Sequence, residues 1–229
     1  GVDIWEPRMI ELQKEYAHKL LTHVNPYTGN AYTDEPCVAM VEISNEDSLL
    51  LSSPDRLPEP YSSELRKQWN AWLHRAYASD RALQVAWEAN QSGAEQGQDH
   101  AKGFADGSIP LIGSDGVFPP LAARDYRLFL LDTDSRHWMD MFNYLKQDLQ
   151  VKMPVSGTQL AYSPPNIQAQ LDYVDRHAYW IHPRGGWISP TGGPWYIDNV
   201  PLVNSLGNIQ NLLAVQRVAN KPFTLSEYN

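Results

Sequence analysis

The sequence predicts an α/β protein built on parallel β-strands, because short apolar segments alternate along the chain with amphipathic helical segments. The predicted strands are residues 37–46, 151–162, 171–180 and 222–228. The predicted helices are residues 5–21, 62–77, 79–89, 122–149 and 204–218. Four strands cannot close a barrel of eight, so this chain does not hold a complete (β/α)8 barrel.

Composition limits the classes of protein to which the chain can belong. It has 229 residues, 42% of them hydrophobic and 20% charged, which is typical of a globular protein with a real core. The net charge of −9 with scattered basic residues argues against a nucleic-acid partner. No apolar run of about 18 residues is present, so we expect no membrane span. No cofactor is predicted, and the preferred interpretation assigns no metal site.

The first half of the chain is predicted to be mostly helical. Residues 5–21 place apolar side chains at three- and four-residue spacing, and Asp3 is a plausible N-cap. Residues 62–77 carry a stripe of tryptophan, leucine and tyrosine that is typical of a core helix. A Gly-rich stretch at 91–116 predicts a long loop. Residues 55–120 are therefore predicted to be an insertion that covers one face of the core.

The second half returns to strands. The helix at 122–149 is expected to break near Asp132–Asp134, where Asp134 would cap a second piece. A long Gly/Pro/Trp loop at 182–201 separates the third strand from the last helix. No strand precedes the first helix, as though the chain began inside a longer protein. The single cysteine, Cys37, falls in the first predicted strand and is expected to be a small core residue.

Two predicted strands end in a glutamate, and this pair carries the chemistry. Glu46 follows the apolar run 37–45, and Glu227 ends the run 222–226. Strand ends on one rim of a parallel sheet bring distant residues together. Two carboxyl groups, one acid and one base or nucleophile, are what glycoside hydrolysis requires. An isolated glutamate is usually a solvated surface residue. Two at strand ends, one preceded by Asn45, favour a catalytic pair.

Three short motifs resemble one enzyme family. Ile43–Glu46 resembles the Asn-Glu signature at the end of the fourth barrel strand in glycoside hydrolase clan A, the cellulase-like glycosidases. Ser226–Tyr228 is similar to the clan's seventh-strand nucleophile segment, and His177–Tyr179 to the His-x-Tyr that the clan often carries on the sixth strand. The three motifs occur in the clan's order. The resemblance implies that residues 1–229 are a single incomplete (β/α)8 barrel catalytic domain covering strands four to seven.

The resemblance also implies roles. Glu46 would be the acid/base and Glu227 the nucleophile of a retaining enzyme that cleaves β-linked oligo- or polysaccharides. Asn45 would contact the sugar 2-hydroxyl, and His177 or Tyr179 would hold Glu227 and the sugar. Strands one to three and eight are not in the chain. Either the sequence is a fragment of a longer gene, or a complementary chain or self-association completes the barrel.

Loop aromatics and one amide complete the predicted site. The candidate sugar platforms are Trp180, Trp187 and Trp195, and Gln159 is expected to line the rim. Tryptophans in Gly/Pro-rich loops suit the stacking of sugar rings, but they also pin long loops, and the sequence leaves both readings open.

Other functions compete with this interpretation. A non-catalytic carbohydrate-binding or scaffold fragment would use the loop tryptophans alone. Asp172, Asp175 and His177, with His182 nearby, have the residue types of a metal-dependent hydrolase. Ser226 lacks the Gly-x-Ser-x-Gly elbow of a serine hydrolase, and the Gly-rich stretch lacks a phosphate-binding signature. The compartment stays open, with a secreted or periplasmic protein preferred.

Overall fold

The computed structural model describes residues 1–51, 54–88, 107–113, 118–181, 183–185, 193–204 and 209–228. It divides into two compact units: the first comprises residues 1–34 and 47–151, and the second comprises residues 35–46 and 152–229. Helices and short parallel strands are both present, so the predicted α/β class is confirmed. The described residues form no closed barrel. None of the helices in this part of the chain is long and apolar enough to cross a bilayer.

The first unit is helical. Its α-helices are α1 (Pro7–Leu21), α2 (Tyr61–Ala76), α3 (Asp80–Glu88) and α4 (Pro120–Asn143), and a π-helical segment, Tyr144–Asp148, continues α4. Short 3-10 helices span Val2–Ile4, Tyr32–Asp34, Leu49–Leu51 and Pro54–Arg56. Residues 89–106 and 114–117, in the predicted loop and insertion, lie outside the described residues.

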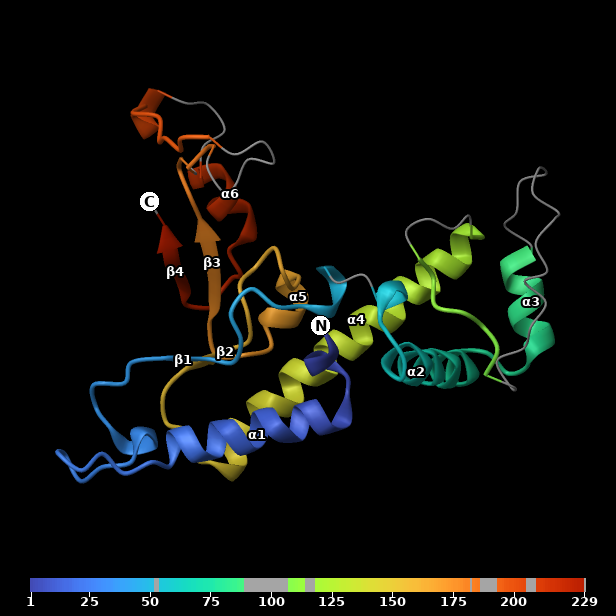
Figure 1. Cartoon of the computed structure of the whole chain (residues 1–229), viewed down its shortest axis with the longest axis horizontal. Coiled ribbons are helices and arrows are strands. Elements are labelled where there is room, and N and C mark those ends of the chain that lie inside the picture. The colour runs from blue at the N-terminus through green and yellow to red at the C-terminus, as the bar shows by residue number, and fades with distance from the viewer. Residues whose placement is uncertain are drawn as a thin grey trace. The chain divides into compact units, whose positions relative to one another are not determined.

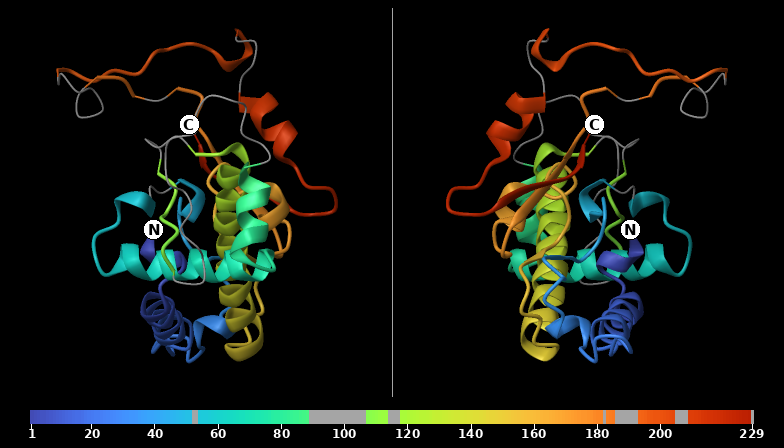
Figure 2. Two further views of the ribbon diagram at one scale, coloured as in Figure 1. Left: turned by 90° about the vertical axis from the view of Figure 1, so that its right-hand side faces the viewer. Right: turned by 90° about the vertical axis from the view of Figure 1, so that its left-hand side faces the viewer.

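The core of the first unit forms where α2 crosses α4 (Figure 1, Figure 2). Trp69 has no exposed surface, and its ring lies 5.2 Å from that of Tyr126 and 5.4 Å from that of Phe129. Leu65 and Leu73, one turn to either side on α2, are also fully buried. The predicted core stripe of residues 62–77 is therefore confirmed.

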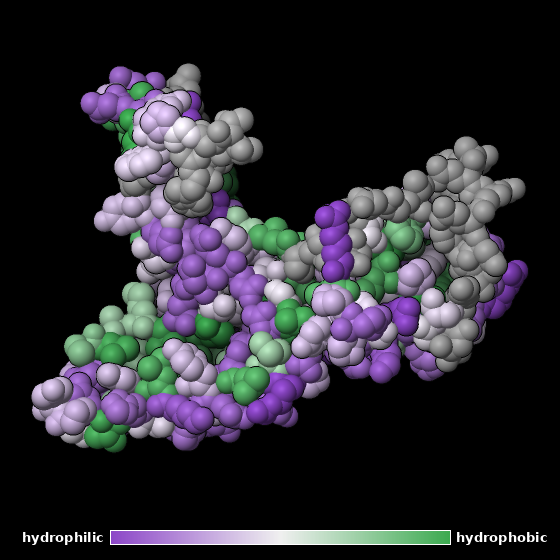
Figure 3. All heavy atoms as spheres, in the orientation of Figure 1, coloured by the Kyte–Doolittle hydropathy of each residue, from purple (hydrophilic) through white to green (hydrophobic). Residues whose placement is uncertain are grey.

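Helix α1 begins and packs differently from the prediction. Its N-cap is Glu6, whose carboxylate accepts the Met9 N–H at 2.7 Å, and Asp3 lies in the preceding 3-10 turn. The expected apolar stripe is not covered, since Leu12 is 40% exposed and Tyr16 is 68% exposed. Figure 3 accordingly shows a mixed surface over α1, in which hydrophilic and apolar side chains alternate.

The predicted break in α4 is wrong. Asp134 lies inside the helix with no exposed surface, and its carboxylate accepts hydrogen bonds from Ser48 Oγ, the Leu49 N–H and Trp138 Nε1 at 2.9–3.1 Å. An Asp that looks like a helix cap therefore caps the start of a different helix, the 3-10 turn Leu49–Leu51. Helix α4 runs through Asp134 without interruption, from Pro120 to Asn143.

The second unit contains the strands. Strand β1 (Val41–Glu42) pairs in parallel with β2 (Val155–Ser156), and β3 (Val174–Ala178) pairs in parallel with β4 (Phe223–Tyr228) (Figure 1). A parallel bridge between Gln159 and Asp175 links the β2 segment to β3. The helices of this unit are α5 (Pro165–Gln168), the 3-10 turn Leu202–Asn204 and α6 (Ile209–Gln216).

The first predicted strand is shorter and less buried than expected. Only Val41 and Glu42 enter a ladder, and both are half-buried, so the expectation of a strand covered on both faces is wrong for the described chain. Cys37 is exposed and lies before the strand, so it is not the predicted core residue. Residues 36–40 contain no ladder partner in the described structure, which leaves this apolar run uncovered.

Candidate active site

The alternation of β3 brings ionisable side chains to one face. Asp175 and His177 of β3 share a side of the strand with Tyr173, the residue before its first position, and all three are buried. Such burial is unusual for an aspartate and a histidine, and it is tolerated only where hydrogen bonds replace water. The partners of these side chains come mainly from β4.

A β-bulge in β4 places more than one polar side chain on that same face. Asp175 pairs with Thr224 and His177 pairs with Glu227, so two residues of β4 lie between pairs that are separated by one residue on β3. Regular pairing would put Ser226 opposite His177. Because the bulge inserts one residue, Ser226 and Glu227 both reach the face of Asp175 and His177.

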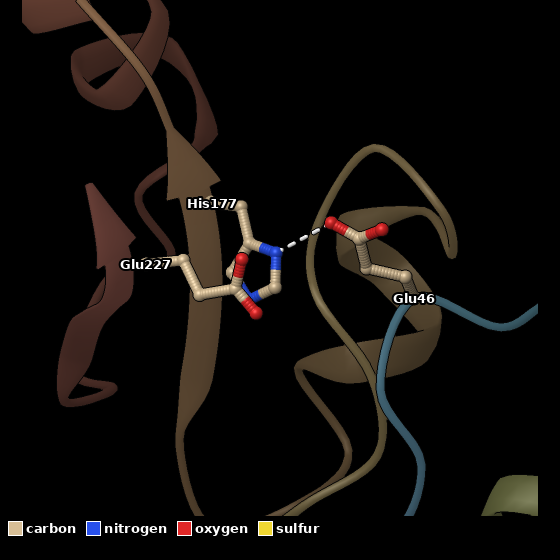
Figure 4. Close-up of side chains that lie close together, drawn as sticks. All are labelled: Glu46, His177 and Glu227. Atoms are coloured by element: carbon tan, nitrogen blue, oxygen red, sulfur yellow. Dashed lines mark hydrogen bonds and ion pairs between the residues drawn. The ribbon is translucent and has the colours of Figure 1, made fainter. Parts of the chain in front are cut away.

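His177 lies between the two predicted catalytic glutamates (Figure 4). Its Nδ1 is 2.7 Å from Glu46 Oε1, and its Nε2 is 3.4 Å from Glu227 Oε1. The ring is buried, whereas the glutamate side chains are 36% and 44% exposed. One oxygen of each glutamate and one nitrogen of His177 lie within 4.8 Å of one another. The two glutamates, far apart in sequence, therefore meet around one imidazole.

Asp175 ties β4 to β3 beneath this trio. Its two carboxylate oxygens accept the hydroxyls of Thr224 and Ser226, each at 2.5 Å. Its Oδ2 is also 4.0 Å from His177 Nε2. With a side chain only 1% exposed, this carboxylate depends on those hydroxyl donors, and the same bonds hold the bulge that directs Glu227.

Two tyrosines contact the glutamates. The Tyr179 hydroxyl donates to Glu227 Oε2, and this bond to the carboxylate, followed by burial, raises the pKa of Tyr179 to about 12. Burial, then a hydrogen bond to Glu46, raises the pKa of the Tyr162 phenol. Each tyrosine therefore remains a hydrogen-bond donor toward its glutamate across the pH range in which proteins work.

A third glutamate and an amide lie behind Glu46. Gln159 Nε2 donates to Glu42 Oε2 at 2.5 Å, and Gln159 Oε1 accepts the backbone N–H of Glu46 at 2.8 Å. Burial raises the pKa of Glu42, and the nearby charges of Asp175 and Glu227 act in the same direction, while the bond from Gln159 lowers it. Glu46 itself has a left-handed backbone, with φ of 49°.

A hollow of about 470 Å³ lies beside these residues in the second unit. Its lining consists of Met40, Glu42, Asn45, Tyr173, Asp175, His177, Thr224, Ser226 and Glu227. Three carboxylates, one histidine and one amide thus face a single space of the size that ligand sites occupy. Asn45, predicted to contact a sugar hydroxyl, is exposed and faces this hollow beside Glu46.

Of the predicted aromatic platforms, Trp180 and Trp195 are not among the residues that line the hollow. Trp180 is half-buried, and its indole N–H donates to the Val200 carbonyl at 2.7 Å, which ties the strand end to the following loop. Trp195 is 64% exposed, next to a bridge between Arg184 and Tyr196. Trp187 lies outside the described residues. For Trp180, the structure favours the loop-pinning reading.

Gln159 does not occupy the predicted place on the rim. Its side chain has no exposed surface, and both ends of the amide are already bonded within the protein. Gln159 is therefore a buried residue behind the site and not an exposed rim residue.

Sequence reasoning missed Glu42 and Tyr162, and it considered Asp175 only as a possible metal ligand. Glu42 stands two residues after Met40, which also lines the hollow, so alternation along the strand is the signal that could have found it. No comparable signal exists for Tyr162, which follows Ala161, a residue with φ of 92° in an irregular turn. Turn geometry of this kind is not readable from residue spacing.

The potential metal ligands differ from those predicted. Asp172 accepts the Val155 N–H at 3.0 Å and so fixes β2 in place. The described group with ligand atoms close enough for one ion is instead Glu46, His177 and Glu227. Two carboxylates and an imidazole are a donor set that zinc accepts. His182, the fourth residue of the sequence-based hypothesis, lies outside the described residues.

Comparisons of the chain with protein-family models, with curated proteins and with solved structures each gave no match.

Proposed function

We propose that the second unit carries the catalytic glutamates of a retaining β-glycosidase that acts on β-linked oligo- or polysaccharides. The observation that carries the proposal is the approach of a Glu46 oxygen to within 4.8 Å of a Glu227 oxygen. Retaining glycosidases hold their carboxyl groups about 5–5.5 Å apart, whereas inverting enzymes separate them by about 6.5–9.5 Å to admit a water. A closest oxygen–oxygen approach within 4.8 Å is compatible with the shorter of these two separations, and on this basis we assign double displacement.

In the first step, a Glu227 oxygen attacks the anomeric carbon, and the bond to the leaving oxygen breaks as Glu46 donates its proton to that oxygen. Glu227 is then esterified to the sugar, and Glu46 is a carboxylate. In the second step, Glu46 removes a proton from water, the water oxygen attacks the anomeric carbon, and Glu227 leaves as a carboxylate. Both residues end in their starting states.

The surrounding residues suit these roles. The Tyr179 hydroxyl donates to Glu227 Oε2, which leaves the other oxygen to attack. The His177 ring lies between the glutamates and fixes the orientation of both. Asn45 lines the hollow next to Glu46, and we assign to it a hydrogen bond with a sugar hydroxyl. Trp195, with its exposed ring, remains a candidate platform for a more distant sugar.

The proposal includes a more specific assignment of the fold. The β1–β2 pair, the Gln159–Asp175 bridge and the β3–β4 pair make one parallel succession in chain order. Parallel strands in sequential order with helices between them are typical of a (β/α)8 barrel. We assign β1 to β4 to strands four to seven of such a barrel, with a complementary chain, a second copy or further sequence supplying the others.

The test is release of an aryl group from aryl β-glycosides, with Glu227→Gln as the decisive variant. Loss of the nucleophile is expected to lower kcat by about 10⁴-fold while circular dichroism stays unchanged. Glu64→Gln, at an exposed position on α2, is the matched control and should retain activity. A first-formed α-anomer, or near-normal turnover by Glu227→Gln, would contradict the assignment. Oligosaccharide binding without any release would identify a carbohydrate-binding module instead.

A second candidate function is metal-assisted hydrolysis. It is favoured by one observation, the proximity of donor atoms from Glu46, His177 and Glu227. In that case His177 and the glutamates would hold an ion. Loss of activity after addition of a chelator would distinguish this candidate from the metal-independent glycosidase.

A further inference from the structure

The backbone of Glu46 has a conformation that needs support. A φ of 49° lies in the left-handed region, which costs a residue other than glycine about 1 kcal/mol or more unless its surroundings hold it. The Glu46 N–H bond to Gln159 Oε1, at 2.8 Å, provides one such restraint. The direction of the Glu46 side chain, and so of its carboxyl group, follows from this backbone conformation.

The amide of Gln159 has a fixed orientation. Its Nε2 donates to Glu42 Oε2 at 2.5 Å, so the NH₂ of the Gln159 amide faces Glu42. The carbonyl of the amide then faces the Glu46 N–H, which needs an acceptor. Since the amide is fully buried, no water is available to take over either bond.

From this chain of contacts we infer that Gln159 is a positioning residue for Glu46, oriented by the Glu42 carboxylate, and that it does not touch the sugar. The inference rests on the proposed function, because it assigns Gln159 to the acid/base half of that mechanism. Gln159 is not among the residues that line the hollow, which separates it from Asn45 and Glu227.

Exchanging the amide and the carboxylate between positions 42 and 159 tests this inference. Gln159→Glu places a second carboxylate against Glu42, so the two repel and the contact to the Glu46 N–H is disturbed. In the double variant Glu42→Gln/Gln159→Glu, the donor moves to position 42 and an acceptor remains at position 159. Both hydrogen bonds are then restored with donor and acceptor exchanged.

The experiment measures kcat/KM of four proteins on two aryl β-glycosides, one with a good leaving group (2,4-dinitrophenol) and one with a poor leaving group (phenol). A good leaving group departs without a proton, so only the poor one reports on the acid. Gln159→Glu is expected to lose about 100-fold on the phenyl glycoside, the scale of general acid catalysis, and less than about 3-fold on the dinitrophenyl one. The double variant should recover to within about 5-fold of the original enzyme.

Gln170→Glu, an exposed glutamine in the same unit, is the fourth protein and controls for the added charge. Equal losses on both substrates, or no recovery in the double variant, would overturn the inference while leaving the glycosidase assignment intact. Absence of release by the original enzyme would instead count against the proposed function.

Hydrogen exchange of the Glu46 amide provides a readout that does not need turnover. Gln159→Ala removes the acceptor, and exchange at Glu46 should become about 10-fold faster or more, with the amides of β3 and β4 unchanged. Unchanged exchange at Glu46 in a folded Gln159→Ala protein would show that the bond does not restrain this residue.

Discussion

The two units each bury a histidine, and the two histidines differ in their neighbours. His137 in α4 is 2% exposed, and neither ring nitrogen has a hydrogen-bond partner among the described residues. His177 in β3 is 6% exposed, and each of its ring nitrogens faces a carboxylate. Desolvation lowers the pKa of His137 to about 4. Equal burial therefore gives an inert packing residue in one unit and a bridge between acids in the other.

The buried aspartates repeat the contrast. In the first unit, Asp125 accepts the Tyr77 hydroxyl at 2.5 Å and the Trp87 indole N–H at 2.9 Å, and both donors are neutral. In the second unit, Asp175 lies among other ionisable groups on the wall of a hollow. Asp175 also accepts neutral hydroxyls, so the difference lies in the surroundings: an acid enclosed among neutral side chains, such as Asp125, serves folding. Acids that face one another around open space are the ones to test for chemistry.

The largest effect expected in the first unit is the loss of Asp134. Asp134→Ala leaves the Ser48 hydroxyl, the Leu49 N–H and the Trp138 indole without their buried acceptor. We expect the free energy of unfolding to fall by about 3–5 kcal/mol, measured by urea denaturation. Asp140→Ala on the same helix, which breaks only the partly exposed pair with Lys14, should cost less than about 1 kcal/mol. Equal losses would remove the distinction between the two acids.

His137 should make the first unit sensitive to acid. Its pKa is about 4 when folded and 6.5 when unfolded, so the unfolded state binds more protons between these values. Stability is therefore retained above pH 6.5 and falls as the pH drops toward 4, by about 3 kcal/mol in all. Denaturation at several pH values should show this slope, and His137→Leu should lack it. A slope that persists in His137→Leu would assign the acid sensitivity to other groups.

Two tyrosines with similar pKa values should behave differently on substitution. Burial, with a bond to Asp125, raises the pKa of Tyr77 to about 12, and a bond to Glu227 raises that of Tyr179 to about 12. Tyr179→Phe should lower kcat about 10-fold, the effect of one lost hydrogen bond to a charged group, with little change in melting temperature. Tyr77→Phe should lower the melting temperature and leave kcat unchanged. The reverse pattern would contradict the division of roles between the units.

Chelation is the smallest expected effect. If Glu46 and Glu227 act as acid/base and nucleophile, EDTA should change the rate of aryl release by less than about twofold, measured after dialysis. Loss of activity with EDTA, restored by added Zn²⁺, would favour the metal-dependent hydrolase at Glu46, His177 and Glu227.

Sequence reasoning captured what depends on spacing along one element. The core stripe of α2 is confirmed, and the three polar motifs at 45–46, 177–179 and 227 were singled out as a group before their contacts were known. It failed where a partner comes from elsewhere. Asp134 was predicted to be a helix cap, but its carboxylate accepts from residues 48 and 49. Gln159 was predicted to be on the rim, but its amide is bonded to Glu42, 117 positions away. Propensity patterns carry no information about such long-range partners.

The bulge in β4 decides which side chains of the strand share the face of Glu227. Successive side chains of a strand point to opposite faces, so the face of any residue is set by whether its distance along the ladder is even or odd. The extra residue between Thr224 and Glu227 changes that parity once. Deleting Leu225 would leave every ionisable group of the site in the sequence and keep Glu227 opposite His177, but it would turn the Ser226 hydroxyl to the face away from Asp175. The hydrogen bond between Ser226 and Asp175 therefore depends on the number of residues in this segment as well as on their identity.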